Sequence, residues 1–481
     1  MQQTITKIEA LFTQVDNAKI LSIEKIPQSG SDRIYFRIAT DNSKTYIATS
    51  SKNIKENNTF LQFSKHFKKY NCPVPAVYAV NDEQDVYIQE DFGHVSLLNK
   101  LEEHGANEYV FNLFKKSLKA LAWLQIKGDE GFNYKWCITS KKFGKQAIIS
   151  DLLYYKYYFL DTLKIPYDKE KLIDDFEVLG TYLSRADYQY FMFRDFQSRN
   201  IMIKNDEPYF IDYQGGMKGA LQYDVASLLW QAKANLSDEW KNSLLEYYIS
   251  CVEQILEEPI DKIRFIGQYN GYVLIRLLQV LGAYGFRGLF ERKAHFLTSI
   301  PLALQNIKWF INNCHVGISV PEFEKLLQLM TADEVIHRFE NVKATEETPL
   351  VVTINSFSYK KGIPEDKSDS GGGFVFDMRG ILNPGRFDEY KHLSGLDKSV
   401  KDFLEQQTAM PVFLNSVYNI VDISVEDYIK RGFANLQVNF GCTGGQHRSV
   451  YAAEALARHL RNKFNVKIHL LHTNKENWKT V

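Results

Sequence analysis

The chain has 481 residues, about three times the roughly 150 residues of a typical domain, so a single small module is excluded. Lysine plus arginine and aspartate plus glutamate both number 58, which leaves no net charge to attract nucleic acid or an acidic membrane. With 45% hydrophobic and 24% charged residues, the composition is typical of a folded protein and excludes general disorder. We therefore expect two or three folded domains.

The cysteines and the apolar segments indicate the compartment. Five cysteines are scattered along the chain without a CxxC pair, which favours a reducing environment. The first residues show no basic segment followed by an apolar stretch, and the longest apolar stretch, GYVLIRLLQVLGAYGF, contains Arg276 and is short for a bilayer span. We expect a soluble cytoplasmic protein with no membrane partner.

The first two thirds of the chain predict a small mixed lobe followed by a helical one. Residues 20–50 predict two or three strands with a hairpin, and a helical period from Asn58 precedes the β-rich runs CPVPAVYAV and DVYIQEDFG. Apolar residues recur at spacings of three and four across 110–124, which predicts a long helix. Helical patterns then dominate to about residue 340, interrupted by short strands in YQYFMFRDF, NIMIK and PYFIDY.

Strands and helices alternate after the polar stretch NVKATEETP. Strands are predicted in VVTINSF, FVFDMRG, NLQVNFG and KIHLLHT, and helices are predicted through KDFLEQQ and from about Ser449. We place a domain boundary near residue 345, which separates a domain of residues 1–340 from a smaller α/β domain of residues 346–481.

Three polar residues in FRDFQSRNIMIKNDEPYFIDYQGG have the spacing that phosphoryl transfer requires. Asp195 precedes Asn200 by five residues, and Asp212 ends a predicted strand shortly afterwards. Transfer from ATP needs a carboxylate that accepts the proton of the attacking hydroxyl, and oxygen ligands for Mg²⁺. We assign the first role to Asp195 and the metal-binding role to Asn200 and Asp212. The alternative is three unrelated polar residues on surface turns.

This segment resembles the catalytic loop of the aminoglycoside phosphotransferase and choline kinase branch of the protein-kinase-like fold. It is most similar to bacterial kinases that phosphorylate the anomeric hydroxyl of N-acetylmuramate and N-acetylglucosamine. SGSDRIYFRI, IQEDFG, YDVASLL and LQVLGAYGFRGLFER match other parts of that family in order, over roughly residues 5–330. The resemblance implies an α+β bilobal fold, with a small lobe of about residues 1–93 and a large lobe of about 94–340. It also implies ATP and Mg²⁺ as cofactors and a small sugar or amino sugar as acceptor.

The resemblance also implies a nucleotide site, with two departures from the family pattern. The residues it assigns to ATP are Ser29, Gly30, Ser31, Arg33, Glu90, Asp91 and Phe92, the last three through the backbone of the hinge between the lobes. Phe193 replaces the usual histidine, and the strand KTYIATSS lacks the lysine that pairs with the α- and β-phosphates. Either Lys52 or Arg33 would then supply the positive charge that this lysine brings to the phosphates. The sugar pocket is expected among the helices after Asp224, and the run YYKYYF is either a sugar-stacking platform or apolar packing.

A second group of candidate site residues lies in the segment GCTGGQHRS. This segment stands between a predicted strand, in which apolar and polar residues alternate, and a predicted helix. A glycine-rich turn of this kind presents backbone N–H groups and a helix N-terminus to an anion. Arg448 beside His447 adds a charged donor suited to phosphate. The spacing of Cys442 and Arg448 also fits C-x5-R-S, the loop of cysteine-dependent phosphatases. The general acid of such an enzyme would be Asp377 or Asp397, so phosphate binding and phosphate hydrolysis both stay open.

SFSYKKGIP, FVFDMRG, LNPG, SGLDKSV and GCTGGQHRSVYAAE resemble the C-terminal domain of the RNase adapter RapZ and its relatives, over about residues 350–475. The resemblance implies a domain that binds a phosphorylated amino sugar, glucosamine 6-phosphate in that family, and in some members a small RNA. The residues assigned to this pocket are Asp377, Arg379, Cys442, Thr443, Gly444, Gly445, His447, Arg448 and Ser449. The P-loop ATPase usual in the family is absent, and so is its basic C-terminal tail. RNA is therefore not the expected partner, although Arg458, Arg461, Lys463 and Lys467 form one small basic set.

Two functions from different classes follow from these patterns. The first is an ATP- and Mg²⁺-dependent kinase of a sugar or amino sugar, joined to a domain that holds a phosphorylated amino sugar. The second is an adapter that binds nucleotide and metabolite without transferring phosphate. The intact Asp195, Asn200 and Asp212 favour the kinase, whereas the missing lysine and Phe193 favour the adapter. The sequence gives no oligomeric state.

Overall fold

The computed structural model describes residues 2–26, 33–291, 294–340, 342–366, 368 and 373–478. Contacts between Cα atoms divide the chain into two compact units. The first comprises Met1–Gly282 and Leu302–Thr331, and the second comprises Ala283–Pro301 and Ala332–Val481. This division and the boundary expected near residue 345 assign the short segments 283–301 and 332–340 differently, so the domain limits stay a prediction.

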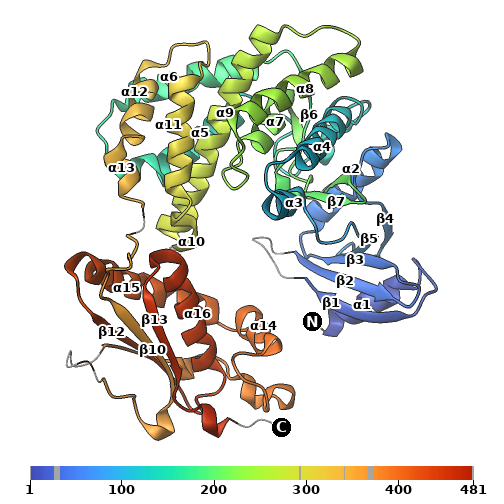
Figure 1. The fold of residues 1–481 in the computed structure, drawn as a ribbon. Coiled ribbons are helices and arrows are strands. Elements are labelled where there is room, and N and C mark those ends of the chain that lie inside the picture. The colour runs from blue at the N-terminus through green and yellow to red at the C-terminus, as the bar shows by residue number, and fades with distance from the viewer. Residues whose placement is uncertain are drawn as a thin grey trace. The chain divides into compact units, whose positions relative to one another are not determined.

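The first unit begins with a five-stranded antiparallel sheet in the order β1-β2-β3-β5-β4 (Figure 1). Its strands are β1 (Ile20–Lys25), β2 (Ile34–Thr40), β3 (Thr45–Ser50), β4 (Val77–Val80) and β5 (Val86–Glu90). Helix α1 (Gln2–Phe12) buries Ile8 and Leu11 against one face of the sheet. Helix α2 (Ile54–Lys69) carries Phe60, whose ring stacks on Tyr87 of β5. The hairpin predicted within residues 20–50 is confirmed as β1–β2, and the helix after it begins at Ile54 rather than Asn58.

Helices make up most of the rest of this unit and confirm the expected bilobal α+β fold (Figure 1). They are α3 (Leu97–His104), α4 (Glu108–Ile126), α5 (Lys145–Tyr158), α6 (Lys169–Ser184), α7 (Leu221–Leu229), α8 (Asp238–Leu256), α9 (Lys262–Tyr284), α11 (Ile300–Asn313) and α12 (Pro321–Met330). Helix α4 includes the predicted helix over 110–124, and its periodic apolar residues are fully buried. Two antiparallel pairs lie among these helices: β6 (Gln189–Met192) with β9 (Met217–Ala220), and β7 (Ile201–Lys204) with β8 (Glu207–Phe210).

One helix is long and apolar enough to cross a membrane by length and composition alone. It runs over Lys262–Phe290, which makes it longer than the apolar stretch noticed in the sequence. Its most apolar window is 56% buried inside the protein. Because the core helix of a soluble protein passes the same test, this helix is weak evidence for a membrane span.

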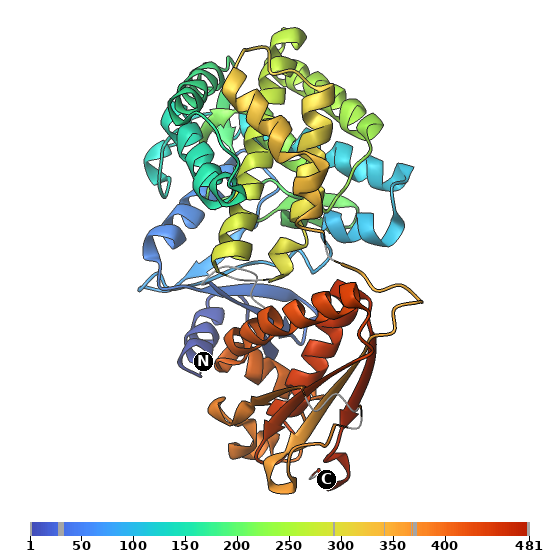
Figure 2. The ribbon, with the colours of Figure 1, turned by 90° about the vertical axis from the view of Figure 1, so that its left-hand side faces the viewer.

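The second unit contains a parallel sheet in the order β11-β12-β10-β13. Its strands are β10 (Val351–Ser358), β11 (Gly373–Asp377), β12 (Asn435–Cys442) and β13 (Lys467–His472). Its helices are α10 (Ala294–Leu297), α13 (Asp333–His337), α14 (Lys398–Gln407), α15 (Met410–Arg431) and α16 (Arg448–Phe464). Helix α16 packs on β10, β12 and β13 and contacts α15 (Figure 2). All four predicted strands and the helices α14 and α16 are confirmed, whereas the sequence analysis did not anticipate α15.

Candidate functional site

A cavity of about 560 Å³ lies where the five-stranded sheet meets the β7–β8 hairpin. All of its lining residues belong to the first unit. The residues predicted to bind ATP or metal that line it are Arg33, Glu90, Asp91, Phe92, Asn200 and Asp212. The predicted ATP-binding residues Ser29, Gly30 and Ser31 lie outside the described residues.

The hinge segment after β5 lines this cavity. The Asp91 side chain is bonded to other protein groups, which leaves the backbone of the hinge to contact a ligand. The Asp91 carboxylate accepts hydrogen bonds from Arg37 Nε at 2.7 Å and from the Gly93 amide at 2.8 Å. The Phe92 ring stacks on Tyr209 with 4.2 Å between centroids, which fixes the segment to the large lobe. Within the part of the chain that the structure describes, no backbone carbonyl accepts a hydrogen bond from the Phe92 amide. That N–H is therefore available to the edge of a base.

Hydrogen bonds connect the loop that carries Asp195 and Asn200 to the strand end next to Asp212. The side-chain amide of Asn200 donates to the backbone carbonyl of Asp195 at 2.9 Å. The Asn200 carbonyl accepts from the amide of Ile211 at 3.1 Å, which links the loop to the strand end that carries Asp212. Gln214 Nε2 donates to Asp212 Oδ1 at 2.8 Å and orients that carboxylate. The loop and the strand end therefore form one connected group.

The donor set fits Mg²⁺ bound together with a nucleotide. Asn200 and Asp212 line the same cavity and carry hard oxygen atoms, the ligands that Mg²⁺ prefers. Mg²⁺ in kinases takes only one or two protein ligands and completes its shell with phosphate oxygens and water. Among the described residues, no cluster of three or more His, Cys, Asp or Glu side chains suited to a metal occurs.

Asp224 of α7 supports the catalytic loop, a role that the sequence analysis did not assign. Its fully buried carboxylate accepts hydrogen bonds from the backbone amides of Phe193 at 2.7 Å and Arg194 at 2.9 Å. Arg194 has a φ of 79°, a backbone conformation that residues other than glycine rarely adopt, and these bonds hold it there. Burial raises the pKa of Asp224 to about 7, although the donated hydrogen bonds oppose that shift. The sequence feature that could have indicated this supporting role is the acidic Asp224 within the otherwise apolar helix YDVASLL.

Asp195 lies beside two arginines rather than among the cavity residues. Its side chain is 47% exposed, and Arg276 Nη2 of α9 is 4.0 Å from Asp195 Oδ1. The neighbouring Arg194 forms an ion pair at 2.9 Å with Asp151 of α5. Burial raises the pKa of Asp151, against the lowering effect of Arg194. Two arginines and a second carboxylate, Asp151, therefore surround the Asp195 carboxylate.

The aromatic run YYKYYF serves mainly in packing. Tyr155 and Phe159 are fully buried, and the Tyr155 hydroxyl contacts Met330 Sδ at 2.7 Å. Tyr157 is exposed. The apolar-packing interpretation is confirmed for the two buried rings.

The second predicted site lies at the carboxyl ends of the parallel strands. In the parallel sheet, Ser358 of β10 lies beside Cys442 of β12, and Asp377 of β11 lies beside Gly441 of β12. Helix α16 begins at Arg448, directly after the glycine-rich loop. Ligands of open parallel sheets bind at this edge, and a helix N-terminus there favours an anion.

The loop folds over the Cys442 thiol. The Gly445 amide donates to Cys442 Sγ at 3.2 Å, and Ser449 Oγ lies 3.2 Å from the same sulfur. Gly445 has a φ of 63°, and an added Cβ there would meet the Ser358 nitrogen at 3.0 Å. A side chain at this position would be both strained and crowded, which explains one of the glycines in the motif.

The Arg448 and His447 side chains are both buried in the described structure. Arg448 Nη1 donates to the carbonyls of Ile381 at 2.7 Å and Arg379 at 3.2 Å. Burial lowers the pKa of His447, so the neutral ring donates from Nε2 to the Tyr390 carbonyl at 2.9 Å. These contacts join the loop to the segment after β11.

The exposed members of the predicted phosphosugar set are Asp377, Arg379, Thr443 and Gly444. Arg379 Nη2 pairs with Asp377 at 2.7 Å, and this hydrogen bond lowers the pKa of Asp377. An ionised carboxylate does not serve as a general acid. This observation weighs against Asp377 as the proton donor of a phosphatase.

Two residues near the C-terminus hold the loop and were not identified from the sequence. Asn474 Nδ2 donates to the Gly444 carbonyl at 2.7 Å, and Trp478 Nε1 donates to the Gly445 carbonyl at 2.9 Å. They follow the loop by about 30 residues in the sequence, so no local sequence pattern links them to it.

The small basic set noted for RNA is partly neutralised. Lys463 and His459 both contact the Asp422 carboxylate, at 2.8 Å each. Lys467 Nζ reaches the Glu346 carbonyl at 3.4 Å. The expectation that RNA is not the main partner stays a prediction.

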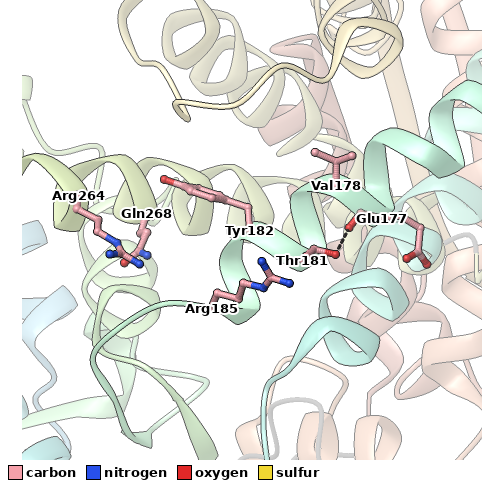
Figure 3. Close-up of a pocket in the computed structure, with 7 residues that line it drawn as sticks. All are labelled: Glu177, Val178, Thr181, Tyr182, Arg185, Arg264 and Gln268. Carbon is pink, nitrogen blue, oxygen red and sulfur yellow. Dashed lines mark hydrogen bonds between the residues drawn. The ribbon is translucent and has the colours of Figure 1, made fainter.

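A separate cavity of about 490 Å³ lies between α6 and α9 (Figure 3). Tyr182, Arg185 and Arg264 line it, and Arg264 pairs with Asp187 at 2.8 Å. It contains none of the predicted site residues, so it is not the candidate active site.

Comparison with known proteins identifies both parts of the chain. The family model described as phosphotransferase enzyme family matches residues 22–258. The model described as RapZ C-terminal domain matches residues 350–476. The chain joins a domain of the phosphotransferase enzyme family to a RapZ C-terminal domain. The phosphotransferase domain contains the 560 Å³ cavity, and the RapZ C-terminal domain contains the glycine-rich loop.

Individual relatives match parts of the chain. A nucleotide-binding protein of Fervidobacterium nodosum is 34% identical over 201 residues, which cover 39% of this chain and 67% of that protein. A nucleotide-binding protein of Clostridium botulinum is 39% identical over 136 residues, 28% of this chain and 44% of that protein. The chain thus spans from less than half to two thirds of these relatives.

Among solved structures, a choline/ethanolamine kinase family protein from Mesorhizobium loti has a TM-score of 0.45 at 12% identity. The match covers 69% of this chain and 98% of that one. A TM-score below 0.5 supports no conclusion about this chain.

Proposed function

We propose that the phosphotransferase domain transfers a phosphoryl group from ATP to a hydroxyl of a small sugar or amino sugar. The observation that carries the proposal is that hydrogen bonds connect the loop of Asp195 and Asn200 to the strand end next to Asp212, with Asn200 and Asp212 lining the cavity under the sheet. Its members have the residue types and the order that phosphoryl transfer requires. The small-molecule phosphotransferase family of the domain agrees with this chemistry.

Each residue has a definite task in this mechanism. The Asp195 carboxylate orients the acceptor hydroxyl and takes its proton as the oxygen attacks phosphorus. Asn200 and Asp212 would hold Mg²⁺ through their side-chain oxygens, and the Phe92 amide would bind the edge of adenine. When bound, Mg²⁺ neutralises charge on the transferred phosphoryl group. Asp224 keeps the loop in its strained conformation, so Asp195 needs little rearrangement during the reaction.

For the RapZ C-terminal domain, we propose binding of a phosphorylated amino sugar at the loop 441–449. The amides of the loop, the N-terminus of α16 and the buried Arg448 supply donors for a phosphate at the sheet edge. The two domains would then act on related metabolites.

Measuring ATP consumption with N-acetylglucosamine, N-acetylmuramate, glucosamine and choline tests the kinase proposal. We expect turnover with one of the sugars and none with choline. If ATP and glucosamine 6-phosphate bind but no acceptor supports turnover, the non-catalytic adapter becomes the better account.

A further inference from the structure

The face of the sheet that lines the nucleotide cavity lacks a cation on β3. Neighbouring strands place Tyr35, Thr49 and Tyr87 in one row across this face. Ile47 lies two residues before Thr49 on β3, so these two side chains point to the same side. Neither can pair with phosphate as the missing lysine would.

Two arginines on this side of the sheet line the cavity. Arg37 of β2 is bonded to the Asp91 carboxylate and to the Gly93 carbonyl, so the other candidate comes from the position before β2. Arg33 lies two residues before Tyr35, is only 3% exposed and lines the cavity together with Asp212. Its Nη2 atom is 2.6 Å from Glu56 Oε1 on α2. Lys52, the other cation considered from the sequence, is exposed and does not line this cavity.

The partner of Arg33 is itself held in place. Glu56 lies in the first turn of α2, and its amide donates to the side chain of the N-cap residue Asn53 at 3.2 Å. Asn53 Nδ2 donates in turn to Glu56 Oε2 at 3.2 Å. One carboxylate oxygen thus contacts the helix cap and the other contacts Arg33, which fixes the guanidinium relative to α2.

We propose that the Arg33–Glu56 ion pair replaces the lysine–glutamate pair of kinases, with the cation moved from β3 to the start of β2. Arg33 then contacts the phosphates of ATP, and Glu56 positions it. A guanidinium carries five N–H donors in a planar fork, so one arginine pairs with a carboxylate and binds phosphate oxygens together. This inference rests on the proposed ATP site.

Calorimetric titration of the full chain with Mg·ATP and with adenosine tests the inference. In Arg33→Met, we expect ATP affinity to fall tenfold or more, with adenosine affinity unchanged within twofold. Adenosine lacks phosphates, so a loss limited to ATP excludes a merely structural effect. Arg33→Lys keeps the charge and should retain most of the ATP affinity, and Lys55→Met on the exposed side of α2 is the matched control.

A compensating change makes the test sharper. In Arg33→Met with Thr49→Lys, a lysine returns to β3, and we expect recovery of at least part of the lost ATP affinity. Unchanged ATP affinity in Arg33→Met, or an equal loss for adenosine, would overturn the inference while leaving ATP binding by the wild type intact. No binding of ATP by the wild type would instead refute the proposed function, and this inference with it.

Discussion

The side-chain amide of Asn200 donates to the backbone carbonyl of Asp195 at 2.9 Å. The residue proposed to bind metal is therefore fixed to the residue proposed to take the proton. The proposed metal site and the proposed catalytic base are thus held in one loop, five residues apart.

We expect Asn200→Ala to lower kcat at least 100-fold, because it removes a metal ligand and frees the loop carrying Asp195. Part of the activity should return at high Mg²⁺, since a weakened site still fills by mass action. Steady-state kinetics across a Mg²⁺ titration measure both effects. Asn112→Ala, on the exposed side of α4, is the control, and wild-type kinetics in Asn200→Ala would contradict the assignment.

The raised pKa of Asp224 predicts that the free energy of unfolding depends on pH. Its folded-state pKa of about 7 lies above the ordinary value of 3.8, so between these values the folded protein keeps a proton that the unfolded chain has lost. This stabilisation is complete below about pH 4 and is lost as pH rises through about 7. The unfolding free energy of wild type minus that of Asp224→Asn should fall by up to about 1.4 kcal/mol per pH unit in this window. Denaturant titrations that give a flat difference would refute the prediction.

Arg276→Gln should change acceptor preference more than ATP use. Loss of a cation near Asp195 weakens an anionic acceptor relative to a neutral one, by roughly fivefold for about 1 kcal/mol. The ratio of kcat/KM for N-acetylmuramate to that for N-acetylglucosamine measures the change, provided that both are substrates. Arg264→Gln on the same helix should leave the ratio unchanged, and an equal ratio in both variants would count against an acceptor role for Arg276.

For the RapZ C-terminal domain, Arg448→Lys should weaken glucosamine 6-phosphate binding about tenfold or more, because lysine cannot reproduce the planar donor fork. Isothermal titration with Arg458→Lys, an exposed position on the same helix, controls for general charge effects. Equal affinities of the wild type and Arg448→Lys for glucosamine 6-phosphate would indicate that the phosphate binds elsewhere.

The same domain should not hydrolyse a chromogenic phosphate ester with Asp377 as the general acid, since that carboxylate is held ionised by Arg379 and is a poor proton donor. Hydrolysis by the wild type that is lost in Cys442→Ser would establish the phosphatase alternative.

Local patterns identified much of this architecture. The period over 110–124 predicted α4, and the catalytic loop containing Asp195 and Asn200 is closed by a hydrogen bond between them, although the roles assigned to Asp195, Asn200 and Asp212 stay predictions. The partners of these residues were not predictable, because Glu56 and Asp224 meet Arg33 and the catalytic loop only through tertiary packing.

Helix α15 was missed for a different reason. Its sequence, MPVFLNSVYNIVDISVEDYIKR, is rich in valine and isoleucine, which have low helix propensity and blur the distinction from a strand. Packing against α16 decides its conformation.

The central claim is phosphoryl transfer through Asp195. The most direct measurement is phosphorus NMR of the purified chain with ATP, Mg²⁺ and each sugar, comparing wild type with Asp195→Asn and with Asp174→Asn, an exposed control on α6. We expect a sugar phosphate signal with wild type and Asp174→Asn, and at least a 1000-fold slower appearance of that signal with Asp195→Asn. Equal rates in the two aspartate variants would contradict the central claim.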